Sequence, residues 1–279
     1  MILFENSRPG DLLTGAFLLG LIVLVLLRRR RLARWGRLLA IYLFLLLLQA
    51  AVPIAAALEI IPPLVAAFFP VVPILAIYST LGFIPELGRG DRDASLIRLD
   101  RVLFRVDPSR WTERFASPWM IELMQLAYLA YYVLPFVLLG TLYQRGDEEA
   151  FQLSITALLL SHYLAFTGYM LVPALGPRFA LKQECRKELN GLFITVPVRK
   201  LLDALEGVKR DAFPSGHASA ILITVFYAVQ FTSELTIWFL PIAALMVIST
   251  VYLRYHYVVD VLAGVLLAAL CLLVTPVLQ

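Results

Sequence analysis

Charged residues are scarce in this sequence of 279 residues, and their scarcity argues against a soluble protein. Only 16% of the residues are charged and 61% are hydrophobic, and the mean hydropathy is +0.82. A soluble domain would be about half apolar. The net charge of +4 comes from Arg and Lys that gather at the ends of apolar runs. We therefore expect membrane lipids, and no nucleic acid, as partners.

Cysteine is almost absent. Cys185 lies in a polar stretch, and Cys271 lies deep in the last apolar run. A disulfide needs Cα atoms within about 7 Å of each other, which these positions do not favour, and neither residue has the spacing of a metal ligand. We expect no disulfide and no metal site from them.

Long uncharged runs dominate the rest of the sequence. A helix needs about 20 apolar residues to cross the hydrocarbon core, and backbone groups in lipid must be satisfied internally. The runs are Leu12–Leu27, Leu38–Leu58, Leu123–Gln144, Phe151–Pro177, Phe213–Ser233, Leu235–Leu253 and, interrupted only by Asp260, Tyr257–Gln279. Basic residues follow the first run rather than precede it, so we expect a membrane anchor and not a signal peptide. The sequence predicts an all-α integral membrane protein, a polytopic helical bundle with seven or eight spans.

Three segments are less regular. Residues 59–85 are long enough to cross, but prolines interrupt them, so we expect either a kinked crossing or a segment that dips into one leaflet and returns. Residues 94–106 and 198–209 carry apolar residues at helical spacing among charges. That pattern indicates short amphipathic helices, the first of them lying on the membrane surface.

Two of the three histidines, His217 and His256, stand beside other polar residues at the start of late apolar runs. Ionisable residues at such positions are costly, which makes them functional candidates. His256 and Asp260 are four residues apart, so a helix would place them on one face. The carboxylate could accept the Nδ1 proton and leave Nε2 as a base or nucleophile. Arg254 is near enough to bind an anion.

The stretch DAFPSGHAS, residues 211–219, has the composition of a helix N-terminus that binds an anion. Pro214 suits a first turn, where its missing N–H would be unpaired anyway. The amides of Ser215, Gly216 and His217 would then lie at the positive end of the helix dipole. Gly216 would let an anion approach the backbone closely.

A third helix end carries Arg178 after a Gly-Pro turn, with Lys182 one turn further on. A planar guanidinium matches phosphate oxygens. The loop between the helices at 150–173 and 214–232 places Arg178 on the same side of the membrane as His217. Two further crossings return the chain to that side at His256, so we expect one site.

Other polar and aromatic residues within the runs have simpler explanations. We expect His162 to make a hydrogen bond inside the bundle, with Ser161 or a neighbouring carbonyl. Tyr131 and Tyr132 are expected to pack or to lie at the membrane interface, and the alternative is that they line a lipid groove.

The candidate residues resemble the motifs of the type 2 phosphatidic acid phosphatase (PAP2) superfamily, which is related to the vanadium haloperoxidases. Its second motif, Pro-Ser-Gly-His, matches residues 214–217, and its third, a nucleophilic His followed four residues later by Asp, matches His256 and Asp260. PALGPRF (173–179) replaces the usual first motif, and Thr250 replaces the usual Ser of the third. Both departures resemble the branch that includes inositol phosphorylceramide synthases.

The resemblance covers roughly residues 120–276 and implies a six-helix catalytic core. We expect this core in residues 119–279, after N-terminal membrane helices and an interfacial segment in residues 1–118. The resemblance implies that His256 attacks phosphorus to give a phosphohistidine, that Asp260 orients it, and that His217 transfers the proton. The residues expected to hold the phosphate are Arg178, Lys182, Ser215, Gly216 and Arg254.

The acceptor decides which reaction follows. With water, the protein would be a lipid phosphate phosphatase, which we expect, and with an alcohol such as inositol it would be a phosphotransferase. No cofactor is expected, because no carboxylate cluster of the Mg²⁺ type accompanies the motifs. A non-enzymatic transporter or scaffold is the third alternative, although a transporter would place its polar residues near the helix middles. The oligomeric state stays open.

The orientation depends on residues 59–85. The basic cluster Arg28–Arg31, with Arg34 and Arg37, favours a cytoplasmic first loop. If 59–85 does not cross, seven spans leave the site outside the cytoplasm, as the resemblance also implies. If it crosses, eight spans put the site inside. We expect the outward-facing site, in a bacterial inner membrane or an endomembrane.

Overall fold

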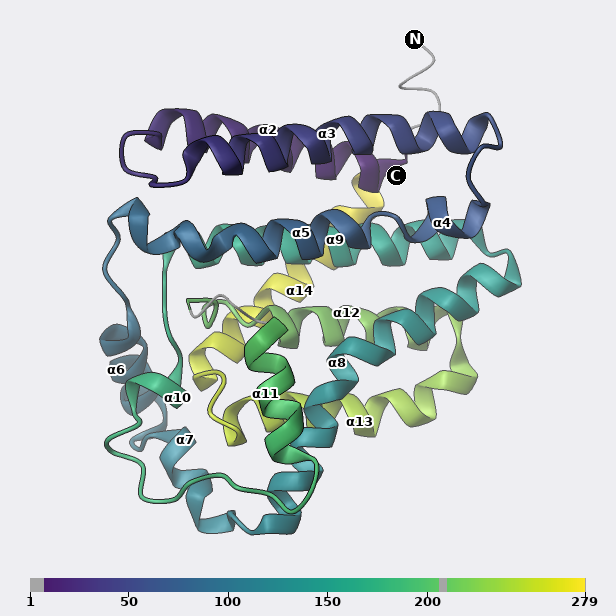
Figure 1. Ribbon diagram of the computed structural model, residues 1–279. Coiled ribbons are helices and arrows are strands. Elements are labelled where there is room, and N and C mark those ends of the chain that lie inside the picture. Colours follow the sequence, from purple (N-terminus) through teal and green to yellow (C-terminus); the bar gives the residue numbers. More distant parts are fainter. Residues whose placement is uncertain (1–7, 206–209, 279) are drawn as a thin grey trace.

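The computed structural model describes residues 8–205 and 210–278, and every regular element in these ranges is a helix (Figure 1). The longest are α2 (Pro9–Arg28), α3 (Trp35–Ala57), α8 (Pro118–Arg145), α9 (Glu148–Leu171), α13 (Ser233–Tyr252) and α14 (Val258–Leu278). Together with residues 63–87, they make seven described segments that are long and apolar enough to cross a membrane. The prediction of an all-α polytopic membrane protein is confirmed.

The proline-rich segment crosses as a chain of short helices: α4 (Pro63–Phe68), α5 (Val71–Thr80) and the 3₁₀ helix η1 (Leu81–Leu87). At the N-terminal end of α2, Nη2 of Arg8 donates to the Ala66 carbonyl at 2.7 Å. Beyond the other end of α2, the Ala33 amide donates to the Glu86 carboxylate at 2.6 Å. The segment therefore runs the full length of α2, as a kinked crossing and not a re-entrant loop.

The shorter helix α12 (Gly216–Phe231) lies at the centre of the bundle, where α8, α9, α13 and α14 all pack against it. At its far end, Nη1 of Arg145 in α8 donates to the Phe231 carbonyl at 3.2 Å. Helix α12 thus connects the two ends of the bundle, although its 16 residues make it shorter than the seven segments above. Figure 1 shows α2 and α3 as an outer layer, with α5 and α9 between them and α12.

The remaining helices gather at the end of the bundle where α12 and α14 begin (Figure 1). They are α6 (Asp93–Phe104), α7 (Pro108–Trp111), the 3₁₀ helix η2 (Thr112–Phe115), α10 (Pro177–Ala180) and α11 (Thr195–Leu205). Helices α6 and α11 are the two predicted amphipathic helices. Residues 206–209 of the second prediction lie outside the described residues.

The arginine-rich loop between α2 and α3 lies at this same end. Nη1 of Arg89 donates to the carbonyl of Leu171, at the C-terminus of α9, at 3.4 Å. Arg28 lines a small pocket together with these two residues. The loop that begins at Arg28 is therefore on the same side of the membrane as the end of α9.

Candidate active site

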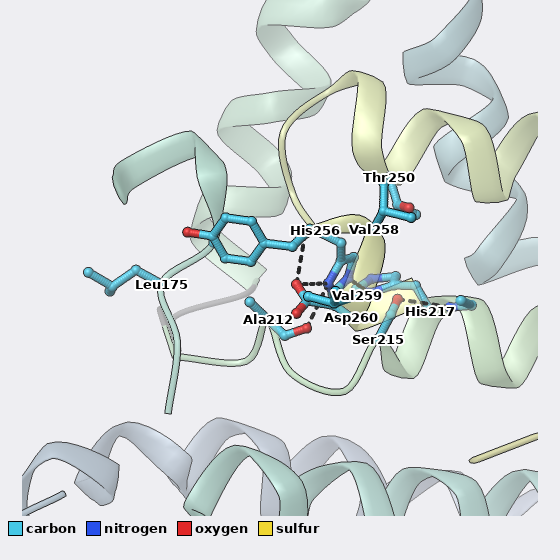
Figure 2. A network of polar contacts seen from close by, with 12 residues as sticks. Leu175, Ala212, Ser215, His217, Thr250, His256, Val258, Val259 and Asp260 are labelled. Atoms are coloured by element: carbon cyan, nitrogen blue, oxygen red, sulfur yellow. Dashed lines mark hydrogen bonds and ion pairs between the residues drawn. The ribbon is translucent and has the colours of Figure 1, made fainter. Parts of the chain in front are cut away.

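Two histidines from separate segments meet at this end of the bundle (Figure 2). His217 lies in the first turn of α12, and His256 lies in the turn between α13 and α14. Nε2 of His256 is 3.3 Å from Nδ1 of His217, and His256 is 2% exposed. The structure thus brings together the two histidines that the sequence placed on one side of the membrane.

Asp260 approaches His256 in a different way from the one expected. Helix α14 begins at Val258, so His256 precedes the helix, and the predicted shared helix face is wrong. In the first turn, Oδ2 of Asp260 accepts the Tyr257 amide at 2.8 Å. The first amides of a helix have no partner within the helix, and this carboxylate satisfies one of them. The same oxygen lies 3.7 Å from Nδ1 of His256. The contact between the carboxylate and the imidazole is therefore made across a turn and not along one helix face.

The hydrogen-bond partner of His256 Nδ1 is the carbonyl of Ala212, at 2.8 Å (Figure 2). A carbonyl can only accept, so Nδ1 carries the proton and Nε2 keeps its lone pair. The sequence had assigned this task to Asp260. A backbone acceptor has no side-chain signature, so Ala212 could not be found in the sequence.

Tyr128 of α8 orients the second histidine. Because Nε2 of His256 accepts, Nδ1 of His217 is the donor between the two rings. Nε2 of His217 then accepts from the Tyr128 hydroxyl, at 2.8 Å. Tyr128 is buried, and its ring stacks on Tyr255 with centroids 4.5 Å apart. Sequence reasoning missed it, because a tyrosine in an apolar run is usually a packing residue.

Helix α6 braces both loops of the site with buried carboxylates. Asp100 accepts the amides of Val258 and Val259, at 3.0 and 2.9 Å, and so caps α14 next to His256. Asp93 accepts the amides of Leu175 and Gly176, both at 2.9 Å, just before Arg178. Burial raises the pKa of the Asp100 carboxyl, and its two backbone hydrogen bonds oppose that rise.

The sequence did not reveal this role of α6, because its apolar stripe pointed to the membrane. Leu99 and Leu103 of that stripe are indeed half exposed, whereas Asp93 and Asp100 on the other face are buried. The acidic face of the helix therefore contacts the protein. Since α6 precedes residue 119, it extends the support of the site beyond the predicted catalytic core.

The start of α12 differs in part from the predicted anion site. Ser215 is the N-cap, and its Oγ accepts the Ala218 amide at 3.2 Å. Its own amide donates to the Asp260 carbonyl at 3.0 Å, so the expectation that this amide is open to an anion is wrong. At Gly216, a Cβ would come within 2.6 Å of the Tyr169 hydroxyl, so close packing also requires a glycine there.

The predicted phosphate-binding arginines are paired with carboxylates. Arg178 makes two bonds of 2.7 Å to Asp203 of α11. Arg254, with a left-handed φ of 66°, donates to Glu113 at 2.8 Å. The backbones of the two arginines are joined, because the Arg178 amide donates to the Arg254 carbonyl at 2.7 Å.

A basic cavity of about 550 Å³ lies beside these arginines. Its cationic lining residues are Arg178, Lys182, Arg186, Lys187, Arg199 and Arg254. Neither histidine is among the described residues that line it, although Arg254 is two positions from His256. The cavity therefore adjoins the histidine pair without containing it, and its charge suits an anion.

The third histidine is bonded within the bundle, as expected. Nδ1 of His162 donates to the Leu158 carbonyl at 2.7 Å, and its Nε2 lies 3.0 Å from the Tyr131 hydroxyl. Both cysteines are free. In residues 8–205 and 210–278, no group of three or more His, Cys, Asp or Glu side chains is arranged to hold a metal ion.

Comparison with known proteins agrees with the site. The family model described as the PAP2 superfamily matches residues 94–274, which is more than half of the chain. A PA-phosphatase related-family protein of Dictyostelium discoideum is 25% identical in an alignment of 187 residues that covers 58% of this chain. The alignment covers 33% of that relative, so this chain spans about a third of its length. No solved structure matches.

Proposed function

The chain belongs to the PAP2 superfamily, and from this premise we propose that it is a membrane-embedded phosphatase that hydrolyses a lipid phosphomonoester through a phosphohistidine. The observation that supports this most directly is the histidine pair. The Ala212 carbonyl leaves a lone pair on Nε2 of His256, and a proton donor, Nδ1 of His217, lies 3.3 Å away. A nucleophile and an acid in contact are what phosphoryl transfer requires.

The reaction has two steps. Nε2 of His256 attacks phosphorus, a P–N bond forms, and the ester P–O bond breaks in line. His217 acts in its doubly protonated form, in which Nε2 donates to the Tyr128 oxygen; it gives its Nδ1 proton to the departing alkoxide and becomes neutral. The buried Asp260 carboxylate stabilises the charged imidazole of His256. Water then attacks phosphorus, His217 accepts a proton from it, and the P–N bond breaks to release inorganic phosphate.

The phosphate oxygens need cations during both steps. We propose Arg178, Arg254 and Lys182 for this task, with Gly216 at the helix N-terminus. Asp203 and Glu113 now hold the two guanidinium groups, and each ion pair must open when the phosphate arrives. The carboxylates keep the two guanidinium groups oriented while no anion is bound.

A phosphotransferase is the second candidate, and the basic cavity favours it. Its volume of about 550 Å³ lies in the range of sites for whole small molecules. Six cationic residues line it, which suits a polar acceptor or headgroup that carries further negative charge. The two reactions share the phosphohistidine and differ only in the molecule that accepts the phosphoryl group from it, water or an alcohol.

Product analysis separates the two candidates. Purified protein in detergent would receive a lipid phosphate, with and without inositol, and in a parallel reaction a phosphoinositol lipid together with a lipid alcohol as acceptor. Release of inorganic phosphate that is independent of inositol supports the phosphatase. Appearance of inositol phosphate, or of a new phosphoinositol lipid, supports the transferase. If no phosphorus compound turns over, both candidates are wrong.

Replacing Tyr128 with Phe is expected to lower kcat by roughly fivefold with little change in KM. The ring and its stacking on Tyr255 remain, and only the hydrogen bond to His217 is lost, which is worth about 1 kcal/mol. His217 can then change its tautomer, so the pH profile of kcat should shift as well. Steady-state kinetics across pH measure both effects. An unchanged profile with an unchanged kcat would contradict the orienting role.

Charge now argues for a site that faces the cytoplasm. The expectation of an outward-facing site required that 59–85 does not cross, but this segment and α12 both connect the two ends of the bundle. The loop at Arg28–Arg31 lies on the side of the histidines, and the positive-inside rule places that loop in the cytoplasm. The family resemblance implies the opposite side, so the orientation is a proposal that needs its own experiment.

Cysteine labelling of intact cells tests the orientation. We expect Gln183→Cys, exposed on the site side, to react with a membrane-impermeant maleimide only after permeabilisation. Its matched control, Glu149→Cys, is exposed at the opposite end and should react at once. Both variants carry Cys185→Ser. The reverse pattern would establish the outward-facing site.

A further inference from the structure

A narrow apolar pocket lies inside the membrane region, among α5, α8 and α9. Its volume is about 280 Å³. Leu158 and Leu159 of α9 form its buried wall, and the half-exposed Leu75 of α5 and Phe136 of α8 lie at its outer edge. The pocket thus extends from the lipid-facing surface to the core of the bundle.

One aromatic ring, that of Tyr131, lies between the inner part of this pocket and the histidine pair. Tyr131 lines the pocket, and its ring centroid is 4.2 Å from that of His217. His162 lines the pocket as well, and its hydrogen bonds to the Leu158 carbonyl and the Tyr131 hydroxyl engage both ring nitrogens. Both ring nitrogens of His162 are therefore engaged, and apart from His162, Tyr131 and Tyr132 the pocket is lined by apolar residues.

The pocket wall also contains residues from outside the matched family region. Val71, Ile74 and Leu75 belong to α5, whereas the family match begins at residue 94. The proline-kinked crossing thus adds a wall to a bundle that carries the histidines on α12 and before α14. The N-terminal helices therefore contribute a wall to a pocket that adjoins the histidine pair.

We propose that this pocket, with its wall from α5, holds the alkyl chain of the lipid substrate while its phosphate lies at His256. The proposal rests on the proposed phosphoryl-transfer function and adds the place where the chain binds. A substrate whose phosphate lies at the histidines and whose alkyl chain passes Tyr131 into the pocket would occupy both regions at once. A headgroup bound in the basic cavity would extend from the phosphate in the opposite direction.

The alkyl chain of a substrate should increase kcat/KM most when the substrate binds from aqueous solution. A buried methylene contributes about 0.8 kcal/mol, which corresponds to roughly a fourfold change per methylene. A lipid already in a bilayer gains little from this transfer, because the bilayer is equally apolar. Alkyl phosphates below their micellar concentration are therefore the sensitive probes, and kcat/KM should rise with chain length until the pocket is full.

Leu75→Trp tests the pocket by filling it from its exposed edge. We expect the kcat/KM of the variant for dodecyl phosphate to fall at least tenfold. Its kcat/KM for p-nitrophenyl phosphate, which has no alkyl chain, should stay unchanged. Leu47→Trp on α3, also exposed to lipid, is the matched control and should leave both values unchanged. If Leu75→Trp affects the two substrates equally, or if kcat/KM of the wild type does not rise with chain length, the proposal is wrong.

A binding experiment keeps this test separate from the proposed function. An alkyl phosphate with a diazirine at the chain end should crosslink to residues 71–75 or 155–159 of the His256→Ala variant, which cannot turn it over. Labelling of lipid-facing residues elsewhere, with none in these segments, would overturn the pocket assignment even if the protein proves to be a phosphatase. Labelling in these segments with no turnover by the wild type would instead refute the phosphoryl-transfer function.

Discussion

Replacing His256 with alanine is expected to abolish phosphate release, lowering kcat by about 10⁴-fold or more, as the loss of a nucleophile does in other covalent enzymes. Among the residues that the structure describes, we find no other nucleophile positioned to replace it. The described neighbours of Nε2 include His217, whose Nδ1 proton points at it, and a protonated nitrogen has no lone pair for attack. The imidazole is 2% exposed, so its removal leaves a cavity that water alone would fill.

Trapping the intermediate makes this prediction specific. A phosphohistidine is labile in acid and stable in base, and the chain has only three histidines to carry it. Labelled phosphate from the substrate should stay on the wild type after rapid denaturation in base and be absent from His256→Ala. His162→Gln is the control for the third histidine: its two ring nitrogens bond Leu158 and Tyr131, so the variant should still be labelled, even if its place in the apolar pocket slows the labelling. Label on the His256→Ala variant would assign the nucleophile elsewhere.

The membrane bundle could be predicted because a bilayer limits the possible structures so strongly. An uncharged run long enough to cross the bilayer must form a helix to satisfy its backbone hydrogen bonds. Five of the predicted spans agree with α2, α3, α8, α9 and α13 within a few residues. The uncertain segment was the one rich in proline. Whether its breaks make a kink or a reversal depends on packing against α2, which a pattern of single residues does not contain.

The histidine pair could also be predicted, since each histidine begins an apolar run and the crossings alternate. The bonds that fix their tautomers could not. One is made by the backbone of Ala212, and the other by Tyr128, 89 positions before His217 in the chain. The start of α14 was placed two residues early, because the Asp260 carboxylate caps Tyr257 instead of facing His256 along a helix.

The two arginines show a different limit. Sequence position predicts that Arg178 and Arg254 bind the phosphate together, and their backbones do meet. Their side chains point to Asp203 and Glu113, which come from α11 and η2. A partly buried guanidinium must be paired, and here a carboxylate pairs with each of the two arginines. The acidic partners were invisible to motif spacing, since they lie 25 and 141 positions away.

Replacing His217 with alanine should have an effect that depends on the leaving group. General acid catalysis contributes roughly 10²- to 10⁴-fold, and an alkoxide needs it, because it is a strong base when it departs. We therefore expect alkyl phosphates to lose that much in the rate of the first step. The phenolate of p-nitrophenyl phosphate is a weak base, so its departure should slow by less than about tenfold.

Single-turnover measurements separate this first step from the second, in which the same His217 would act as a base. With p-nitrophenyl phosphate, the His217→Ala variant should release nitrophenolate in a fast burst and then accumulate the phosphohistidine, because water attacks without help. With an alkyl phosphate, it should do neither. Tyr128→Phe is the graded control: it keeps the imidazole and should show the same asymmetry at a few-fold level. An equal loss for both substrates would mean that His217 serves binding or folding, and the proton would have to come from another group.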